Sequence, residues 1–197
     1  MSDPADTWRD MVHRHAESIE HGKVGIAPDP QRPAAAVLAC SDARVPPSLI
    51  FGHEGELFVV RLAGNSATPG AIASLTYAVE HLQTDLVVVL GHSGCGAVEA
   101  ALAGHAPPTL NPILTPIDDM LAACEACDDI DSAVASNVRY NVQRLRRDRG
   151  PLGRAIAEGR VAIRGAVHDL RTGLLVDLET ETTADQTPRQ HPITPTP

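Results

Sequence analysis

Side chains that can bind a metal gather in two short motifs of this sequence. One motif is CSDAR at residues 40–44, and the other is GHSGCG at residues 91–96. Two thiolates and one imidazole suit zinc, and three protein ligands leave a fourth coordination position open for a reaction. The motifs therefore predict a catalytic zinc site with Cys40, His92 and Cys95 as its ligands.

A structural role for the same residues is the competing interpretation. The H-x-x-C spacing of His92 and Cys95 is by itself equally compatible with a core histidine and a buried cysteine. Cys40 ends a different predicted strand, however, and side chains at the carboxyl ends of neighbouring parallel strands can converge. This second position favours the metal site.

An acid–base pair follows the first cysteine, because Asp42 and Arg44 lie two and four residues after Cys40. A carboxylate beside zinc can accept a proton from bound water or bind the metal itself, and a guanidinium keeps that carboxylate ionised and oriented. A surface salt bridge is the alternative, which would have little effect. The position next to a candidate ligand favours a catalytic role.

Hydrophobic patterns predict the elements that must position these motifs. A helix between two apolar strands implies parallel pairing with a right-handed crossover, and a later strand pair is joined by the turn RTG. The predicted fold class is α/β, with a central, mostly parallel β-sheet of four strands plus an antiparallel edge strand, flanked by helices. The predicted strands are 34–40, 57–63, 85–92, 160–170 and 174–179, and the predicted helices are 7–20, 69–83, 94–104 and 132–148.

The chain is expected to form a single zinc-binding α/β domain over residues 1–180. Residues 1–33 supply its N-terminal helix and linker. Residues 181–197 are polar and proline-rich, so this tail is expected to be disordered. The proline-rich residues 105–118 are expected to form a loop.

A second pair of cysteines, Cys124 and Cys127, has a C-x-x-C spacing but no matching pair for another zinc site. In a chain without an export signal, cysteines are expected to be thiols or metal ligands rather than disulfides. We therefore expect Cys124 and Cys127 to pack in a helix as thiols.

Composition excludes several classes of function. The formal net charge is −9, which disfavours binding to nucleic acid. No apolar run is long enough to span a bilayer, and the start MSDPADTWRD has no apolar stretch of a secretory signal. The sequence therefore predicts a cytoplasmic protein with no membrane partner.

The motifs together resemble a known family. CSDARVPP, GELFVVRLAGN, SLTYAVEHL and VVLGHSGCGAVEAAL occur in the order and at the spacing of the β-class carbonic anhydrases. The resemblance implies one Zn²⁺ per subunit on Cys40, His92 and Cys95, and an Asp42–Arg44 dyad. In closed members of the family the aspartate takes the fourth zinc position, whereas in open members the arginine holds it back and water binds.

The resemblance also implies a substrate pocket and an oligomer. Its pocket residues would be Gln31, Phe58, Ala63, Tyr77 and Gly96. The pocket would lie partly across the interface of a homodimer, or of a higher multiple of dimers, with the N-terminal helix on the partner.

Some positions depart from the family pattern. Leu62, Ala63 and His168 replace commoner Asn, Val and Tyr residues, which puts substrate choice in question. Val37 stands where the closed branch has Trp, and together with Gln31 it favours the open, plant-type branch.

The implied activity is the reversible hydration of carbon dioxide to bicarbonate and a proton, with zinc hydroxide as the nucleophile and no organic cofactor. Three alternatives stay open at this point. The same fold could hydrolyse carbon disulfide or carbonyl sulfide, it could be a catalytically silent zinc-binding regulatory domain, or its zinc could be purely structural.

Overall fold

The computed structural model describes residues 3–21, 30–52, 56–104 and 106–179. Contacts within the chain divide it into two units, Met1–Gln31 and Arg32–Pro197. The predicted tail at 181–197 and most of the predicted linker lie outside the described residues.

The first unit contains one helix, α1 (Pro4–Glu20), among its described residues. Asp3 caps the helix by accepting a hydrogen bond from the Ala5 N–H at 2.9 Å, and Pro4 occupies the first turn, where its missing N–H costs nothing. The predicted helix at 7–20 is confirmed. Within the single chain none of its residues is buried.

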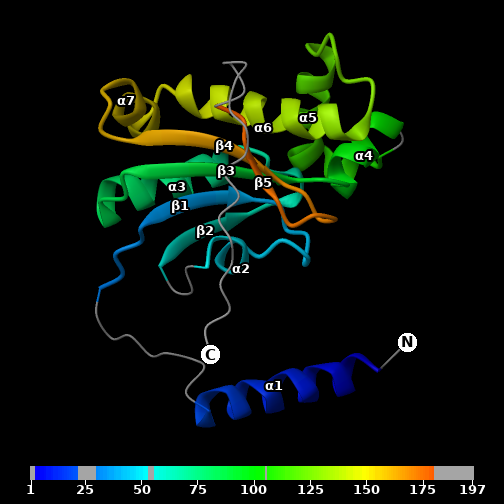
Figure 1. Cartoon of the computed structure of the whole chain (residues 1–197), viewed down its shortest axis with the longest axis vertical. Helices are drawn as coiled ribbons and strands as arrows, with labels where there is room; N and C mark the ends of the chain where they lie inside the picture. Colours follow the sequence, from blue (N-terminus) through cyan, green and yellow to red (C-terminus); the bar gives the residue numbers. More distant parts are fainter. Residues whose placement is uncertain (1–2, 22–29, 53–55, 105, 180–197) are drawn as a thin grey trace. The chain divides into compact units, whose positions relative to one another are not determined.

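The second unit is built on a five-stranded sheet in the order β2-β1-β3-β4-β5 (Figure 1). The first four strands run parallel, and β5 pairs antiparallel with β4. The predicted fold class is therefore confirmed. The strands are β1 (Ala35–Ala39), β2 (Leu57–Arg61), β3 (Leu86–His92), β4 (Ala162–His168) and β5 (Leu175–Asp177).

Helices connect and cover these strands. The α-helices are α2 (Pro47–Phe51), α3 (Pro69–Leu82), α4 (Gly96–Ala103), α5 (Asn111–Ala122), α6 (Ile130–Arg146) and α7 (Pro151–Ala157), and the 3-10 helices are η1 (Ala63–Asn65) and η2 (Pro108–Leu110). None of the described helices combines the length and the apolarity that crossing a membrane requires.

The main core lies between the sheet and helices α3, α6 and α7, where β1 contributes Ala36 and Leu38. Two glycines let α6 approach the sheet closely. A Cβ atom at Gly91 would lie 2.5 Å from Val138 Cγ2, and one at Gly165 would lie 2.9 Å from Val138 Cγ1. The absence of side chains on β3 and β4 therefore sets where α6 lies.

A second core cluster surrounds the carboxyl ends of the strands. It joins the buried Cys40 and Cys95 to apolar side chains of α4, α5 and α6, such as Val98, Ile117 and Val134. This cluster packs α5 directly beside the predicted site.

The expected loop at 105–118 is wrong from residue 108 onward. That segment forms η2 and most of α5. Pro112 lies in the first turn of α5, where it is tolerated, and Leu114, Ile117 and Met120 are buried at helical spacing. Burial of this apolar face outweighs the helix-breaking effect of Pro116. The short helix α7 was not predicted.

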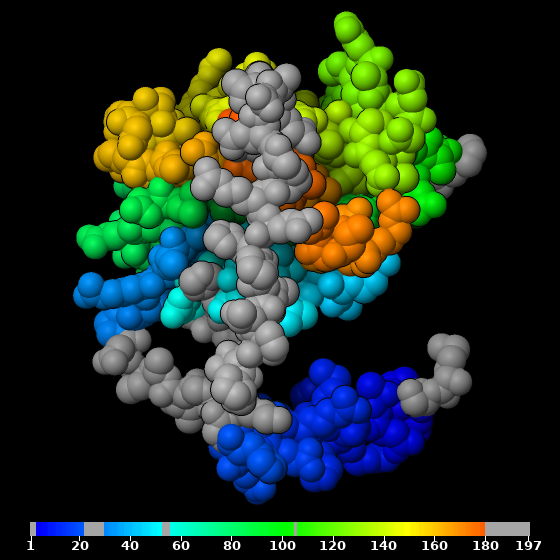
Figure 2. Space-filling view, viewed as in Figure 1, coloured from blue at the N-terminus to red at the C-terminus, as the bar shows by residue number. Residues whose placement is uncertain are grey.

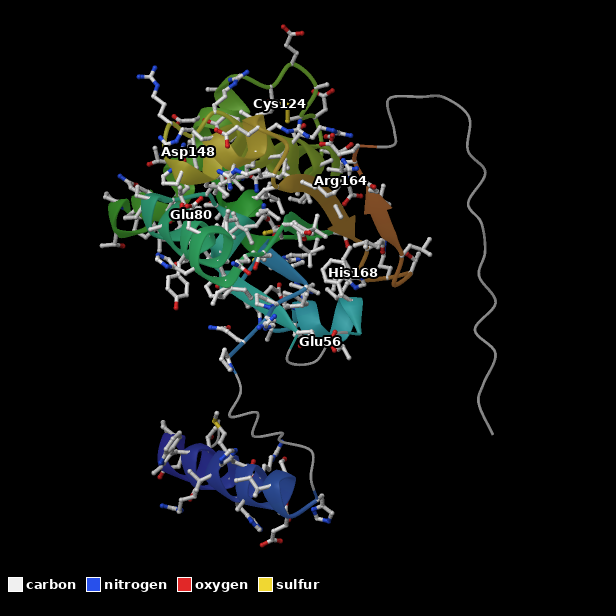
Figure 3. The ribbon with its side chains drawn as sticks, turned by 90° about the vertical axis from the view of Figure 1, so that its left-hand side faces the viewer. Glu56, Glu80, Cys124, Asp148, Arg164 and His168 are labelled. Atoms are coloured by element: carbon white, nitrogen blue, oxygen red, sulfur yellow. A yellow bond between two sulfur atoms is a disulfide. The ribbon has the colours of Figure 1, made fainter. Side chains whose placement is uncertain are left out.

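The expectation that Cys124 and Cys127 are thiols packed in a helix is also wrong. The two residues follow the end of α5 and are joined by a disulfide. In Figure 2 the yellow-green residues between α5 and α6 project from the surface of the unit, and Figure 3 labels Cys124 there.

Candidate metal centre

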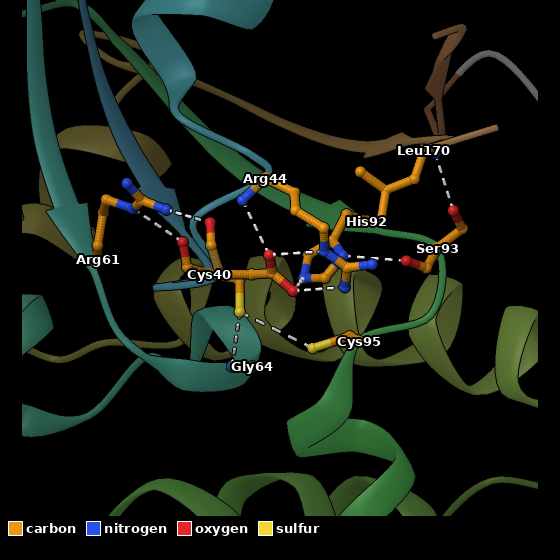
Figure 4. A network of polar contacts seen from close by, with 9 residues as sticks. Cys40, Arg44, Arg61, Gly64, His92, Ser93, Cys95 and Leu170 are labelled. Carbon is orange, nitrogen blue, oxygen red and sulfur yellow. Dashed lines mark hydrogen bonds and ion pairs between the residues drawn. The ribbon is translucent and has the colours of Figure 1, made fainter. Parts of the chain in front are cut away.

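Cys40, His92 and Cys95 come together at the carboxyl ends of β1 and β3. Cys40 follows the last residue of β1, His92 is the last residue of β3, and Cys95 caps α4. Because β1 and β3 are parallel neighbours, their ends lie side by side. The ligand atoms of the three residues all lie within 4.8 Å of one another. Figure 4 shows the three side chains gathered beside Arg44.

The imidazole of His92 is buried and held in one orientation. Its Nδ1 lies 3.0 Å from the Ser93 carbonyl oxygen, which accepts a hydrogen bond from it. The Nε2 atom has no hydrogen-bond partner among the described residues and therefore carries a free lone pair. A buried polar atom of this kind is costly unless something binds it.

Ser93 is itself fixed by β4 and the residues after it. Its N–H donates to the His168 carbonyl oxygen at 3.0 Å, and its hydroxyl accepts from the Leu170 N–H at 2.9 Å. The orientation of His92 therefore depends on a strand that is distant in sequence.

The two thiols share a proton. The Sγ atoms of Cys40 and Cys95 lie 3.9 Å apart, and the hydrogen bond from Cys95 lowers the pKa of Cys40 to about 4, against the opposing effect of burial. The same contact is the largest cause that raises the pKa of Cys95, with burial next. Burial lowers the pKa of His92, but the adjacent Cys40 thiolate outweighs burial and raises this pKa.

These properties fit zinc. Two sulfur atoms that each lie about 2.3 Å from a tetrahedral zinc ion are about 3.8 Å apart, close to the separation found here. A divalent cation would also take the place of the proton that the thiols share. The unpartnered Nε2 of His92 would provide the third ligand atom.

Backbone N–H groups face both sulfur atoms. Gly64 donates to the Cys40 sulfur at 3.4 Å. The N–H groups of Ala97 and Val98, in the first turn of α4, act to lower the pKa of Cys95. The start of a helix and a tight turn thus favour negative charge at this centre.

Asp42 and Arg44 form a two-pronged ion pair beside the ligands. Arg44 donates from Nε to Asp42 Oδ1 at 2.9 Å and from Nη2 to Oδ2 at 2.6 Å. The Arg44 hydrogen bond is the largest cause that holds the pKa of Asp42 well below its usual range. Oδ2 lies 3.9 Å from His92 Nε2, so this ionised carboxylate faces the ligand cluster.

Sequence reasoning missed Arg61 as a supporting residue. Its guanidinium, at the end of β2, donates from Nε to the Cys40 carbonyl oxygen at 2.9 Å and from Nη2 to the Asp42 carbonyl oxygen. It thereby fixes the backbone on both sides of the first ligand. A cation at the end of an otherwise apolar strand was the available signal.

Gly64 was missed as well. It has φ +68°, and a Cβ atom there would lie 2.6 Å from Ile117 Cδ1 of α5. Its carbonyl oxygen accepts from Asn137 Nδ2 of α6 at 2.8 Å. Helices α5 and α6 therefore both hold the turn whose N–H faces Cys40.

The residues of the expected substrate pocket are more scattered. Phe58 and Tyr77 lie against each other, with ring centroids 6.2 Å apart, and Phe58 is in register with Ala36 rather than with the end of β1. Ala63 precedes Gly64 in η1, and Gly96 begins α4. Gln31 belongs to the first unit and is exposed there.

Two of the positions that depart from the family pattern, Leu62 and His168, lie beside the strands that carry the ligands. Leu62 donates its N–H to the Ala39 carbonyl oxygen at 3.0 Å. His168 is in register with His92, and its Nδ1 is buried without a hydrogen-bond partner among the described residues (Figure 3).

Comparison with known proteins identifies the family. Residues 35–175 match a family model described as carbonic anhydrase. The chain is 32% identical over 171 residues to carbonic anhydrase 2 of Mycobacterium tuberculosis, which covers 82% of this chain and 81% of that protein. A solved Coccomyxa β-carbonic anhydrase, in complex with acetazolamide, superposes with a TM-score of 0.69 and 26% identity, covering 88% of this chain and 82% of that one. The chain belongs to the β-class carbonic anhydrase family.

Other β-carbonic anhydrases agree with this assignment. The carbonic anhydrase of Pseudomonas aeruginosa is 35% identical over 166 residues, which is 76% of this chain and 74% of that protein. A tetrameric β-carbonic anhydrase from Sordaria macrospora has a TM-score of 0.65 at 25% identity, covering 88% and 92% of the two chains. The resemblance read from the motifs is thereby confirmed, and this carbonic anhydrase is an enzyme with a buried Cys-His-Cys group at its strand ends.

Proposed function

We propose that the protein catalyses the reversible hydration of carbon dioxide to bicarbonate and a proton, with one Zn²⁺ per subunit held by Cys40, His92 and Cys95. The observation that carries this proposal is the cluster of His92 with two free thiols, whose ligand atoms lie within 4.8 Å of one another, together with the buried, unpartnered Nε2 of His92. Membership of the carbonic anhydrase family supports the same reaction.

The chemistry divides between metal and protein. When bound, zinc would lower the pKa of a coordinated water and so provide a nucleophile near neutral pH. Asp42 accepts a hydrogen bond or a proton at Oδ2, the oxygen that lies 3.9 Å from His92 Nε2. Arg44 keeps that carboxylate ionised and oriented.

We infer that the enzyme works in the open form, with Asp42 on Arg44 and the fourth position free. Both carboxylate oxygens of Asp42 already accept hydrogen bonds from Arg44, which supports this form. Val37 adds support, because it is fully buried in β1 where the closed branch carries Trp.

The substrate pocket and the oligomer are proposals that belong together. Tyr77 is 48% exposed and packs against Phe58 on the edge strand β2, so the pair is available to a second subunit of a homodimer. Ala63 and the Gly96 N–H would contribute from the same subunit, and Gln31 would bind the substrate. A cytoplasmic location stays a prediction from the sequence.

Stopped-flow measurement of carbon dioxide hydration by the purified zinc-loaded protein tests the function. We expect hydration far above the buffer rate, rising from neutral to mildly alkaline pH. Carbonyl sulfide and carbon disulfide, assayed beside carbon dioxide, test whether Leu62 and Ala63 shift the substrate. Bound zinc with no turnover of carbon dioxide would contradict the proposal and favour a hydrolase of those substrates or a silent zinc-binding domain.

A further inference from the structure

A second sulfur site lies outside the metal centre, at the link between α5 and α6. Cys124 and Cys127 form a disulfide there, and each residue is half-buried. The two residues between them, Glu125 and Ala126, are exposed. Because both cysteines are partly exposed, a reductant in solution can approach this disulfide.

We propose that the Cys124–Cys127 disulfide is a reversible thiol–disulfide exchange site, opened by a dithiol, whose state adjusts the metal centre. The effect on the metal centre rests on the proposed function. A thiolate of the dithiol attacks one protein sulfur, forms a mixed disulfide and releases the other cysteine as a thiolate. The second thiol of the dithiol then displaces the first cysteine.

The exchange is balanced in atoms and electrons. The protein disulfide gains two electrons and becomes two thiols, and the dithiol is oxidised to its own disulfide. The two protons come from the thiols of the reductant. No further co-reactant is needed.

The short loop argues against a purely stabilising role for this disulfide. A cross-link stabilises a fold mainly by restricting the unfolded chain, and that effect grows with the length of the closed loop. Here the cysteines are only three positions apart. Their bond therefore acts chiefly on the local geometry of the α5–α6 link.

The sulfur atoms contact both helices that the link joins. Cys127 Sγ lies 3.9 Å from Met120 Sδ of α5, and Cys124 Sγ lies 3.7 Å from Ser136 Oγ of α6. The link then leads directly into Asp129, the residue whose side chain caps α6 at the Ser132 N–H. Opening the bond releases the end of α5 from the start of α6.

The same two helices hold the turn next to Cys40. From α5, Ile117 packs against Gly64, and the Ile113 carbonyl oxygen accepts a 2.8 Å hydrogen bond from the Ser66 hydroxyl. From α6, Asn137 donates to the Gly64 carbonyl oxygen. Since the Gly64 N–H donates to Cys40 Sγ, a shift between α5 and α6 reaches a metal ligand through one residue.

A second metal site is the main rival for a C-x-x-C pair, and the structure does not favour it. Among the described residues, the single cluster of three ligand atoms at metal-binding spacing is the one at Cys40, His92 and Cys95. Cys124 and Cys127 are bonded to each other instead.

The test compares the zinc-loaded wild type with a Cys124→Ser/Cys127→Ser double variant, each treated with oxidised or reduced dithiothreitol. Alkylation and mass spectrometry report the state of each cysteine. Release of zinc to a chromophoric chelator and carbon dioxide hydration report the metal centre. The double variant also reveals any direct attack of the dithiol on the zinc, because it retains Cys40 and Cys95.

We expect the dithiol to expose Cys124 and Cys127 to alkylation reversibly, and to change zinc release and hydration severalfold in the wild type. The double variant should resemble the reduced wild type and not respond further. A disulfide that resists the dithiol overturns the proposal, as does a reduced wild type with unchanged zinc release. Reversible reduction with altered zinc release but no hydration in either state would support the exchange site and refute the proposed function instead.

Discussion

The two pairs of cysteines in this protein have the same side chains and opposite fates. Cys40 and Cys95 are 55 positions apart, buried and unbonded, with sulfur atoms 3.9 Å apart. Cys124 and Cys127 are three positions apart, half-buried and joined in a disulfide.

Backbone rigidity explains the difference. Cys40 follows the end of β1, and Cys95 lies at the start of α4, just after β3. Hydrogen bonds and packing fix these elements in place. The two sulfur atoms therefore stay beyond bonding distance and next to His92. The second pair lies in a link without regular structure, where the chain can bring two sulfur atoms together. A fixed gap with an adjacent imidazole suits a metal, whereas a free link suits a covalent bond.

The largest expected effect is a loss of zinc when a residue of the metal centre is replaced, but not when Cys124 and Cys127 are replaced. Cys40→Ser, His92→Ala or Cys95→Ser should each lose zinc, and hydration should fall at least about 100-fold, because each change removes a ligand rather than a supporting contact. Metal analysis and stopped-flow hydration check this.

The matched control is Cys124→Ser/Cys127→Ser, which should keep one zinc per subunit. If that variant lost zinc as completely as the ligand variants, the division of the cysteines into two functional classes would be wrong. Unchanged zinc in all three ligand variants would refute the metal centre itself.

A smaller effect is expected at the turn that connects both regions. Gly64→Ala adds strain at φ +68° and a contact with Ile117, so we expect a loss of about 2–4 kcal/mol in the free energy of unfolding, together with weaker zinc binding. Gly104→Ala is the control, since Gly104 has the same φ with nothing within 4 Å of an added Cβ. It should cost about 1 kcal/mol and leave zinc binding unchanged. Urea unfolding gives the loss of unfolding free energy for each of the two variants. Equal losses in Gly64→Ala and Gly104→Ala would show that Ile117 does not hold Gly64.

Arg61 should affect the metal centre at Cys40 and Cys95 but not the disulfide of Cys124 and Cys127. Arg61→Met removes the hydrogen bonds to the carbonyl oxygens of Cys40 and Asp42, and supporting contacts of this kind change metal affinity by about 10–100-fold. Competition with a zinc chelator measures the change. The alkylation pattern of Cys124 and Cys127 should not change, and a variant with wild-type zinc affinity would remove Arg61 from the metal centre.

The smallest effect concerns the acid dependence of stability. Since Arg44 lowers the pKa of Asp42 in the folded protein, the carboxylate stabilises the fold above its unfolded pKa of about 4, and this contribution disappears as pH falls further toward the folded value. Arg44→Gln should therefore be less stable than the wild type near neutral pH, with the difference shrinking in strong acid. Unfolding between pH 3 and 7 measures it, and a difference independent of pH would show that the pair does not contribute through charge. The serine double variant should keep the wild-type acid dependence.

Local patterns were sufficient to predict most of the sheet. The apolar runs that became β1 and β3 and the helical spacing in α3 depend on burial of neighbouring side chains, which the sequence displays directly. The pattern failed at α5, where proline residues suggested a loop. There Leu114, Ile117 and Met120 recur at helical spacing, and their burial against other helices outweighs the proline residues.

The sequence by itself determined the types of ligand, their order and the carboxylate–guanidinium pair beside them, because these are properties of residues and spacing. Only the tertiary structure decided which cysteines stay free and which bond. It also decided that Arg61, Gly64 and Ser93 hold the ligands in place. The physical reason is that the pairing of β1 with β3 and the packing of α5 and α6 on η1 join segments that are distant in sequence. Those contacts fix distances of a few ångströms that the order of residues does not contain.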